Sequence, residues 1–125
     1  MLIEILKALF DCVRKLLKMK ETGEKFSKLA VYDFTSALLA EQAGLEMILV
    51  GDSMGNVVYG YDGTVPMTMD QMIGHAQAVR RGAPNIFIVG DLPFLSYQTS
   101  IEDAVRNAGR FYLSLIHISE PTRPY

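Results

Sequence analysis

The sequence contains little of what several classes of protein require. Only one of its 125 residues is a cysteine, Cys12, so the chain cannot form an internal disulfide or a metal site built from several thiolates. Its 12 basic and 14 acidic residues nearly balance, which leaves no basic field for nucleic acid or an anionic membrane. No apolar run approaches the roughly 20 residues of a membrane span. Half of the residues are apolar and 21% are charged, so we expect a globular, cytoplasmic protein.

Residues 1–24 predict an amphipathic helix. Apolar side chains recur at helical spacing from Leu2 to Leu17, and Gly23 follows as a helix terminator. Glu4 and Asp11 interrupt the apolar residues, which argues against a signal or transit peptide. We expect this helix to pack on the rest of the fold, and a helix lying on a membrane surface is the alternative.

After Gly23 the chain predicts alternating strands and helices. The predicted strands are 26–32, 47–50 and 86–89, and the predicted helices are 36–43, 68–81 and 100–112. The second and third strands are continuous apolar runs, as expected of strands covered on both faces. Thr68 and Gln71 have the spacing of a capping box at the start of the second of these helices. The alternation predicts right-handed βαβ units and a parallel sheet.

Two architectures repeat this unit, the doubly wound sheet and the (β/α)₈ barrel. Neither the dinucleotide fingerprint G-x-G-x-x-G nor the phosphate loop G-x-x-x-x-G-K-[ST] follows any predicted strand. Their absence counts against a doubly wound nucleotide-binding protein but leaves a flavodoxin-like sheet open. A barrel needs about 250 residues, so a barrel would make this chain incomplete.

An aspartate stands at the end of each predicted strand: Asp33, Asp52 and Asp91. The last two share the pattern Val-Gly-Asp, in which glycine permits a sharp turn out of the sheet. Carboxylates on neighbouring parallel strands would lie roughly 5 to 10 Å apart and could hold one Mg²⁺ ion. The alternative is that each aspartate caps a turn or helix, and Asp33 is the one for which we most expect this.

Five segments resemble the ketopantoate hydroxymethyltransferase family, in the family's order. They are Val50–Gly55, Gly60–Thr68, Ala78–Asn85, Asp91–Tyr97 and Arg106–Arg110. The likeness covers about Lys18 to Tyr112, and Val31, Met54 and Gly63 depart from the residues usual in the family.

The resemblance implies a phosphoenolpyruvate-mutase-like (β/α)₈ barrel, of which this chain would hold three βα units. It implies transfer of a hydroxymethyl group from 5,10-methylenetetrahydrofolate to 3-methyl-2-oxobutanoate, giving 2-dehydropantoate in pantothenate biosynthesis. Mg²⁺ chelated by the keto acid would stabilise the enolate that attacks the folate methylene. The same resemblance implies that Asp52 and Asp91 bind the metal. It implies that the keto acid is bound by Asp52, Ser53 and Asp91. It also implies a homo-oligomer, which is a decamer in the family.

Three other polar side chains invite a functional interpretation. His75 lies within a predicted helix, away from the strand ends, and we expect it to be structural rather than a metal ligand. Tyr59 and Tyr61 follow the second strand and either line the site or pack against the fold.

The end of the sequence departs from the family. Residues 113–125 read like the translation of a sequencing adaptor, so we expect a partial barrel over 25–112 followed by a non-native tail, in which His117 and Glu120 form no site. The family's catalytic base lies beyond the matched part, so no catalytic residue is assigned and the chain by itself is expected to be inactive. Two rival interpretations remain: another Mg²⁺-dependent 2-oxo-acid enzyme of the same superfamily, or a non-catalytic binding or receiver-like α/β module.

Overall fold

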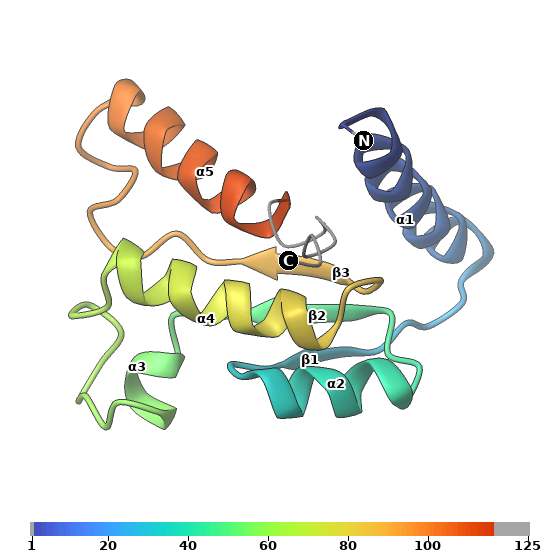
Figure 1. The fold of residues 1–125 in the computed structure, drawn as a ribbon, viewed down its shortest axis with the longest axis horizontal. Helices are drawn as coiled ribbons and strands as arrows, with labels where there is room; N and C mark the ends of the chain where they lie inside the picture. The colour runs from blue at the N-terminus through green and yellow to red at the C-terminus, as the bar shows by residue number, and fades with distance from the viewer. Residues whose placement is uncertain (1, 117–125) are drawn as a thin grey trace, which may run out of the picture.

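The computed structural model describes residues 2–116 and shows an α/β fold (Figure 1). Its elements are α1 (Leu2–Thr22), β1 (Lys28–Ala30), α2 (Phe34–Gln42), β2 (Met47–Val50), α3 (Met54–Val57), α4 (Met69–Gly82), β3 (Phe87–Gly90) and α5 (Ile101–Ile116). Within the described residues the sheet is parallel with strand order β1-β2-β3. Consecutive strands are therefore neighbours, as the predicted βαβ units require.

The strands are in register at their centres, which brings their carboxyl ends to one edge of the sheet. Ile48 of β2 is opposite Leu29 of β1 and Ile88 of β3. In Figure 1 the short helix α3 lies beyond these carboxyl ends, whereas α1 lies toward the opposite end of the strands. The sequence did not predict α3, because its four residues lie in a stretch with no apolar periodicity.

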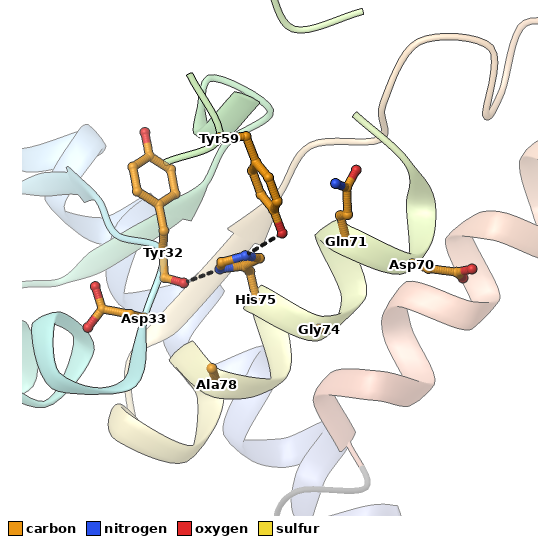
Figure 2. Close-up of a pocket in the computed structure, with 8 residues that line it drawn as sticks. All are labelled: Tyr32, Asp33, Tyr59, Asp70, Gln71, Gly74, His75 and Ala78. Atoms are coloured by element: carbon orange, nitrogen blue, oxygen red, sulfur yellow. Dashed lines mark hydrogen bonds between the residues drawn. The ribbon is translucent and has the colours of Figure 1, made fainter. Parts of the chain in front are cut away.

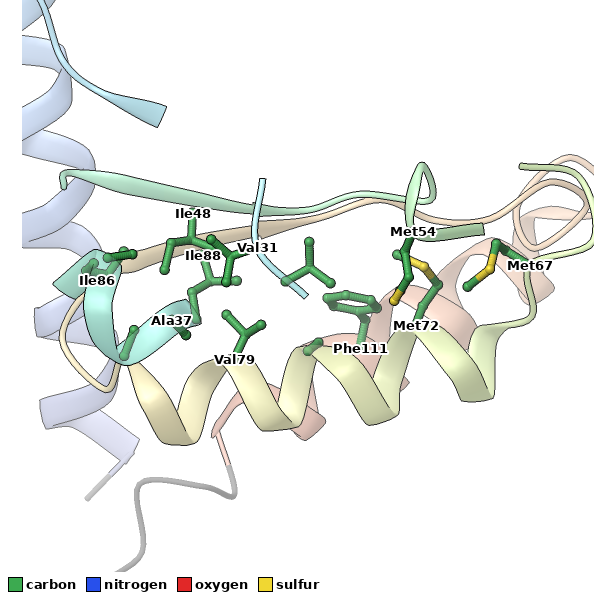
Figure 3. Close-up of a cluster of buried hydrophobic side chains, with 14 of the residues drawn as sticks. Val31, Ala37, Ile48, Met54, Met67, Met72, Val79, Ile86, Ile88 and Phe111 are labelled. Atoms are coloured by element: carbon green, nitrogen blue, oxygen red, sulfur yellow. The ribbon is translucent and has the colours of Figure 1, made fainter. Parts of the chain in front are cut away.

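The core lies between the sheet and the helices that pack on it. Ile48 and Val50 of β2 are fully buried, and Met72 and Val79 of α4 are equally buried against them (Figure 3). Burying four such side chains contributes roughly 1.5–3 kcal/mol each. This packing fixes where β2 and α4 stand, and therefore where the loops after them begin.

The prediction that β2 and β3 are covered on both faces is wrong for the described residues. In β2 the burial alternates: Ile48 and Val50 are buried, whereas Met47 and Leu49 are only partly buried. In β3 only Ile88 is buried, and Phe87, Val89 and Gly90 are partly buried. A continuous apolar run cannot show which of its two faces the helices cover, and here they cover one face while the other stays partly open.

Helix α4 begins with the predicted capping box and ends in a close contact with α2. The capping box is confirmed, with Gln71 N–H donating to Thr68 Oγ1 (3.2 Å) and Thr68 N–H donating to Gln71 Oε1 (2.9 Å). At the other end a Cβ on Gly82 would lie 2.3 Å from the carbonyl oxygen of Phe34. Glycine at this position therefore lets α4 approach the start of α2 closely.

The N-terminal helix forms as predicted but is only partly packed. It is followed by Gly23 at φ +72°, and Glu24 N–H donates to Met19 O (2.9 Å). Met19 is buried, whereas Phe10 and Leu17 are 61% and 53% exposed. Among residues 2–116 no helix combines the length and apolarity that crossing a membrane requires.

The last helix begins where the sequence predicted and runs further. Asp103 N–H donates to Ser100 Oγ (3.1 Å), which confirms the predicted start. Four residues of the predicted tail, from Leu113 on, continue α5, and within them Ser114 is buried and donates to Phe111 O (2.6 Å). The rest of the predicted tail, with His117 and Glu120, lies outside the described residues.

Candidate metal and substrate site

Two of the three strand-end aspartates meet at the carboxyl edge of the sheet. Asp91 follows β3 directly, and its N–H donates to Val50 O (3.0 Å), which extends the pairing of the two strands. Asp52 follows β2 by one residue, and its N–H donates to Asp91 Oδ2 (3.2 Å). The structure thus brings the backbone of Asp52 to the carboxylate of Asp91, and the predicted 5 to 10 Å separation of the two carboxylates stays a prediction.

Gly51 leaves open the space on which this cluster converges. A Cβ built on Gly51 would lie 3.0 Å from Ser53 Oγ and 3.3 Å from Asp91 Oδ2. Both contacts are at or inside the ordinary limit for carbon against oxygen, so any side chain here would displace one of the two oxygens. The glycine of the Val-Gly-Asp pattern therefore serves the site as well as the turn.

Ser53 contributes a hydroxyl that its own helix does not use. It occupies the N-cap position of α3 in a helical conformation (φ −53°, ψ −16°) and makes no side-chain capping bond. Its Oγ lies instead 2.9 Å from the hydroxyl of Tyr32, which follows β1. The cluster therefore draws on the ends of all three described strands.

Asp33 caps a helix, as expected. Its Oδ1 accepts from Ser36 N–H (2.9 Å) and its Oδ2 from the Ser36 hydroxyl (2.8 Å), at the N-cap of α2. These hydrogen bonds, the backbone one first, lower the pKa of Asp33 below its usual value. Both of its oxygens are engaged locally, so we leave Asp33 out of the metal site.

The donor atoms at the edge of the sheet are of the kind that a hard divalent cation takes. Asp52 and Asp91 supply carboxylate oxygens and Ser53 a hydroxyl oxygen, and all three side chains are partly buried. Among residues 2–116, Asp91 Oδ2 accepts one hydrogen bond, from Asp52 N–H, which leaves lone pairs for a ligand. Within residues 2–116 no three His, Cys, Asp or Glu side chains gather in a metal-binding group. Two carboxylates suit Mg²⁺, which usually takes one or two together with water and substrate oxygens.

His75 lies at a separate open hollow of about 550 Å³, between the end of β1 and α4 (Figure 2). Its Nδ1 is 2.6 Å from Tyr32 O, and its Nε2 is 3.1 Å from the hydroxyl of Tyr59. Tyr59 also stacks on Tyr61, with 5.5 Å between ring centroids. His75 thus has the structural role that was predicted, and of the two interpretations of the tyrosines these contacts favour packing. The sequence could not indicate the Tyr32–His75 contact, because it joins residues 43 positions apart.

Comparisons with known proteins identify relatives over most of the chain. A family model described as "Ketopantoate hydroxymethyltransferase" matches residues 11–117. The 3-methyl-2-oxobutanoate hydroxymethyltransferase of Alkaliphilus metalliredigens is 62% identical over 96 residues, which are 77% of this chain and 34% of that protein. The protein of the same name from Geobacillus kaustophilus is 62% identical over 92 residues, which are 74% of this chain and 33% of that protein. The chain therefore spans about a third of the length of these curated relatives.

A solved structure supports the fold. The crystal structure of 2,3-dimethylmalate lyase, described as a PEP mutase/isocitrate lyase superfamily member, matches with a TM-score of 0.62. The match covers 82% of this chain and 37% of that chain at 20% sequence identity, so it bears on the fold alone. It confirms the predicted fold class, an α/β fold in which the described elements cover part of a (β/α)₈ barrel.

Proposed function

The chain belongs to the ketopantoate hydroxymethyltransferase family, and we propose that it forms part of an enzyme that makes 2-dehydropantoate. The enzyme would transfer a hydroxymethyl group from 5,10-methylenetetrahydrofolate to 3-methyl-2-oxobutanoate. The single observation that carries the proposal beyond the family match is the cluster of Asp52, Ser53 and Asp91 at the carboxyl edge of the sheet. In barrels of this kind the chemistry lies at that edge.

We assign a role to each member of this cluster. Asp52 and Asp91 would hold Mg²⁺, which when bound polarises the keto group and so makes the neighbouring C–H more acidic. The hydroxyl of Ser53 would donate a hydrogen bond to an oxygen of the keto acid. Gly51 keeps the space beside Ser53 Oγ and Asp91 Oδ2 free of any side chain.

The family membership supports a proposal on the pathway, the compartment and the assembly of the enzyme, and it weighs against the two rival interpretations. We propose that the enzyme acts in pantothenate biosynthesis, in the cytoplasm, as a homo-oligomer. The match over residues 11–117 favours the transferase over a non-catalytic receiver-like module. The likeness to 2,3-dimethylmalate lyase, at 20% identity, gives no support to a different 2-oxo-acid activity.

A chimaeric protein tests the proposed function. The 96-residue segment of the Alkaliphilus relative that matches this chain would be replaced by this chain's own residues; we call the product the chimaera. Purified chimaera, given 3-methyl-2-oxobutanoate, 5,10-methylenetetrahydrofolate and Mg²⁺, is expected to form 2-dehydropantoate, and EDTA is expected to abolish the product. The 125-residue chain assayed alone is expected to form none. A chimaera that melts cooperatively but makes no product contradicts the proposed function.

A further inference from the structure

The hydroxyl of Ser53 contacts the hydroxyl of Tyr32, and the proposed function does not explain this contact. Tyr32 OH lies 2.9 Å from Ser53 Oγ, and both side chains are partly buried. Tyr32 follows Val31, whose N–H donates to Leu49 O (3.0 Å), so the backbone that carries Tyr32 is still tied to the sheet. The phenol therefore reaches Ser53 from a rigid part of the molecule.

The backbone of Tyr32 is held from the opposite side by His75. A carbonyl oxygen only accepts, so the 2.6 Å contact with Tyr32 O requires the proton of the neutral imidazole to be on Nδ1. Nε2 then accepts from the hydroxyl of Tyr59, 3.1 Å away. Figure 2 shows the ring of Tyr32 turned away from His75 while its carbonyl points toward it. Tyr32 thus joins α4, through His75, to the edge of the sheet where Ser53 lies.

Either hydroxyl could donate in this contact, and their chemistry favours Tyr32 as the donor. A phenol, with a pKa near 10, is a stronger acid than an aliphatic alcohol and so a better hydrogen-bond donor. If Tyr32 donates to Ser53 Oγ, the hydrogen of Ser53 cannot point back at the phenol. It remains available to an acceptor on the open side of the cluster, where Gly51 leaves space.

We infer that Tyr32 is a positioning residue of this site. It fixes Ser53 Oγ and directs the serine hydroxyl as a donor toward an oxygen of the bound 2-oxo acid. His75 in turn holds the backbone of Tyr32 in place. The inference rests on the proposed function, because that function supplies the 2-oxo acid. Neither residue touches the reacting atoms in this scheme. Tyr32 acts through Ser53, and His75 acts through Tyr32.

A double-mutant cycle on ligand binding tests this inference. The dissociation constant of 3-methyl-2-oxobutanoate is measured by calorimetry with the chimaera in Mg²⁺, for Tyr32→Phe, Ser53→Ala and the double variant. Losing one hydrogen bond of this kind is expected to weaken binding about three- to tenfold in each single variant. Because both variants remove the same directed donor, the double variant is expected to bind no more weakly than Ser53→Ala. Tyr112→Phe, which alters a partly exposed tyrosine on α5, is the matched control and is expected to bind normally.

The outcomes separate this inference from the proposed function. Unchanged binding in Tyr32→Phe, or additive losses in the double variant, overturns the positioning role even when the unmodified chimaera turns over. An unmodified chimaera that binds the acid without turnover contradicts the proposed function, and the cycle still decides the role of Tyr32. A chimaera that does not bind the acid overturns both.

A second pair of variants tests the anchor and replaces the first if Tyr32→Phe fails to fold. His75→Asn retains a donor near the position of Nδ1, whereas His75→Leu removes it. We expect the asparagine variant to bind 3-methyl-2-oxobutanoate within about twofold of the unmodified chimaera and the leucine variant about three- to tenfold more weakly. Equal binding by the two variants overturns the anchoring role of His75.

Discussion

Asp33 and Asp91 both lie just past the end of a strand, yet their carboxylates are engaged in different ways. Asp33 accepts two short hydrogen bonds, one on each oxygen, from Ser36 three residues further along the chain. Asp91 Oδ2 accepts one longer bond, 3.2 Å, from the backbone of Asp52, which is 39 residues away. The same side chain is a helix cap in the first place and part of an open oxygen cluster in the second.

The difference arises from the structure of the chain immediately after each strand. After β1 the helix α2 begins at Phe34, directly after Asp33, so the first free N–H groups of that helix are within reach of Asp33. After β3 no helix begins until Ile101, so Asp91 has no helix start beside it. The carboxylate of Asp91 therefore remains available to a ligand, whereas that of Asp33 is used by the helix that follows it.

The largest expected effect is on turnover. Asp52→Asn and Asp91→Asn in the chimaera should each lower Mg²⁺-dependent turnover at least about a hundredfold, because each removes one proposed charged ligand. Asp33→Asn is the matched control and should stay within about twofold, because asparagine caps helices nearly as well as aspartate. Steady-state rates at limiting Mg²⁺ measure all three. If Asp33→Asn lost as much activity as Asp91→Asn, the distinction between the two aspartates would be wrong.

A smaller loss is expected from Gly51→Ala. The added Cβ would lie 3.0 Å from Ser53 Oγ and 3.3 Å from Asp91 Oδ2, so these oxygens must move by a few tenths of an ångström. A displacement of this size should lower turnover about tenfold with little change in melting temperature. Gly63→Ala, where an added Cβ meets nothing within 4 Å, is the control. Normal turnover of Gly51→Ala would show that the cluster tolerates movement.

The next effect is on stability and is expected from replacing Asp33. Asp33→Ala removes the cap of α2 and should lower the free energy of unfolding by about 1 kcal/mol, whereas Asp33→Asn should cost only a few tenths. Urea denaturation of the chimaera, followed by circular dichroism, measures both. An equal loss in the two variants would mean that the negative charge, rather than the capping hydrogen bond, stabilises this end of the helix.

The smallest effect concerns pH. Hydrogen bonds from Ser36 lower the pKa of Asp33, so its ionised form stabilises the folded state. This stabilisation is present above the unfolded pKa of about 3.9 and is lost as the pH falls through the lower folded value. The difference in unfolding free energy between the unmodified chimaera and Asp33→Asn should therefore shrink below about pH 4. A difference that is independent of pH from 3 to 6 would contradict the assignment.

Features encoded over a few residues could be predicted from the sequence. The capping box of Thr68 and Gln71, the cap at Asp33 and the strand Met47–Val50 all depend on neighbours within four residues, and the structure confirms them. The approach of Asp52 to Asp91 was predictable from topology, because parallel strands end at the same edge.

Side-chain contacts between distant residues could not be predicted where no rule of topology brings the two together. The pairing of Tyr32 with Ser53 spans 21 residues and that of Tyr32 with His75 spans 43, and no local pattern indicates either. The partly open face of β2 was missed because an apolar run looks the same whether one face or both are covered. The sequence placed the end of the last helix near Tyr112, whereas α5 ends at Ile116, since helix ends without a glycine or proline carry a weak signal.

The most direct test of the proposed shared ion is the binding of Mn²⁺, a paramagnetic substitute for Mg²⁺, to the chimaera. Electron paramagnetic resonance reports free Mn²⁺ and so gives the number of bound ions and their dissociation constant without any turnover. We predict one site, with the same dissociation constant in Asp33→Asn and a constant at least about tenfold higher in Asp52→Asn and in Asp91→Asn. Unchanged Mn²⁺ binding in Asp91→Asn, or equal weakening in Asp33→Asn, would contradict the claim that Asp52 and Asp91 share one ion while Asp33 caps a helix.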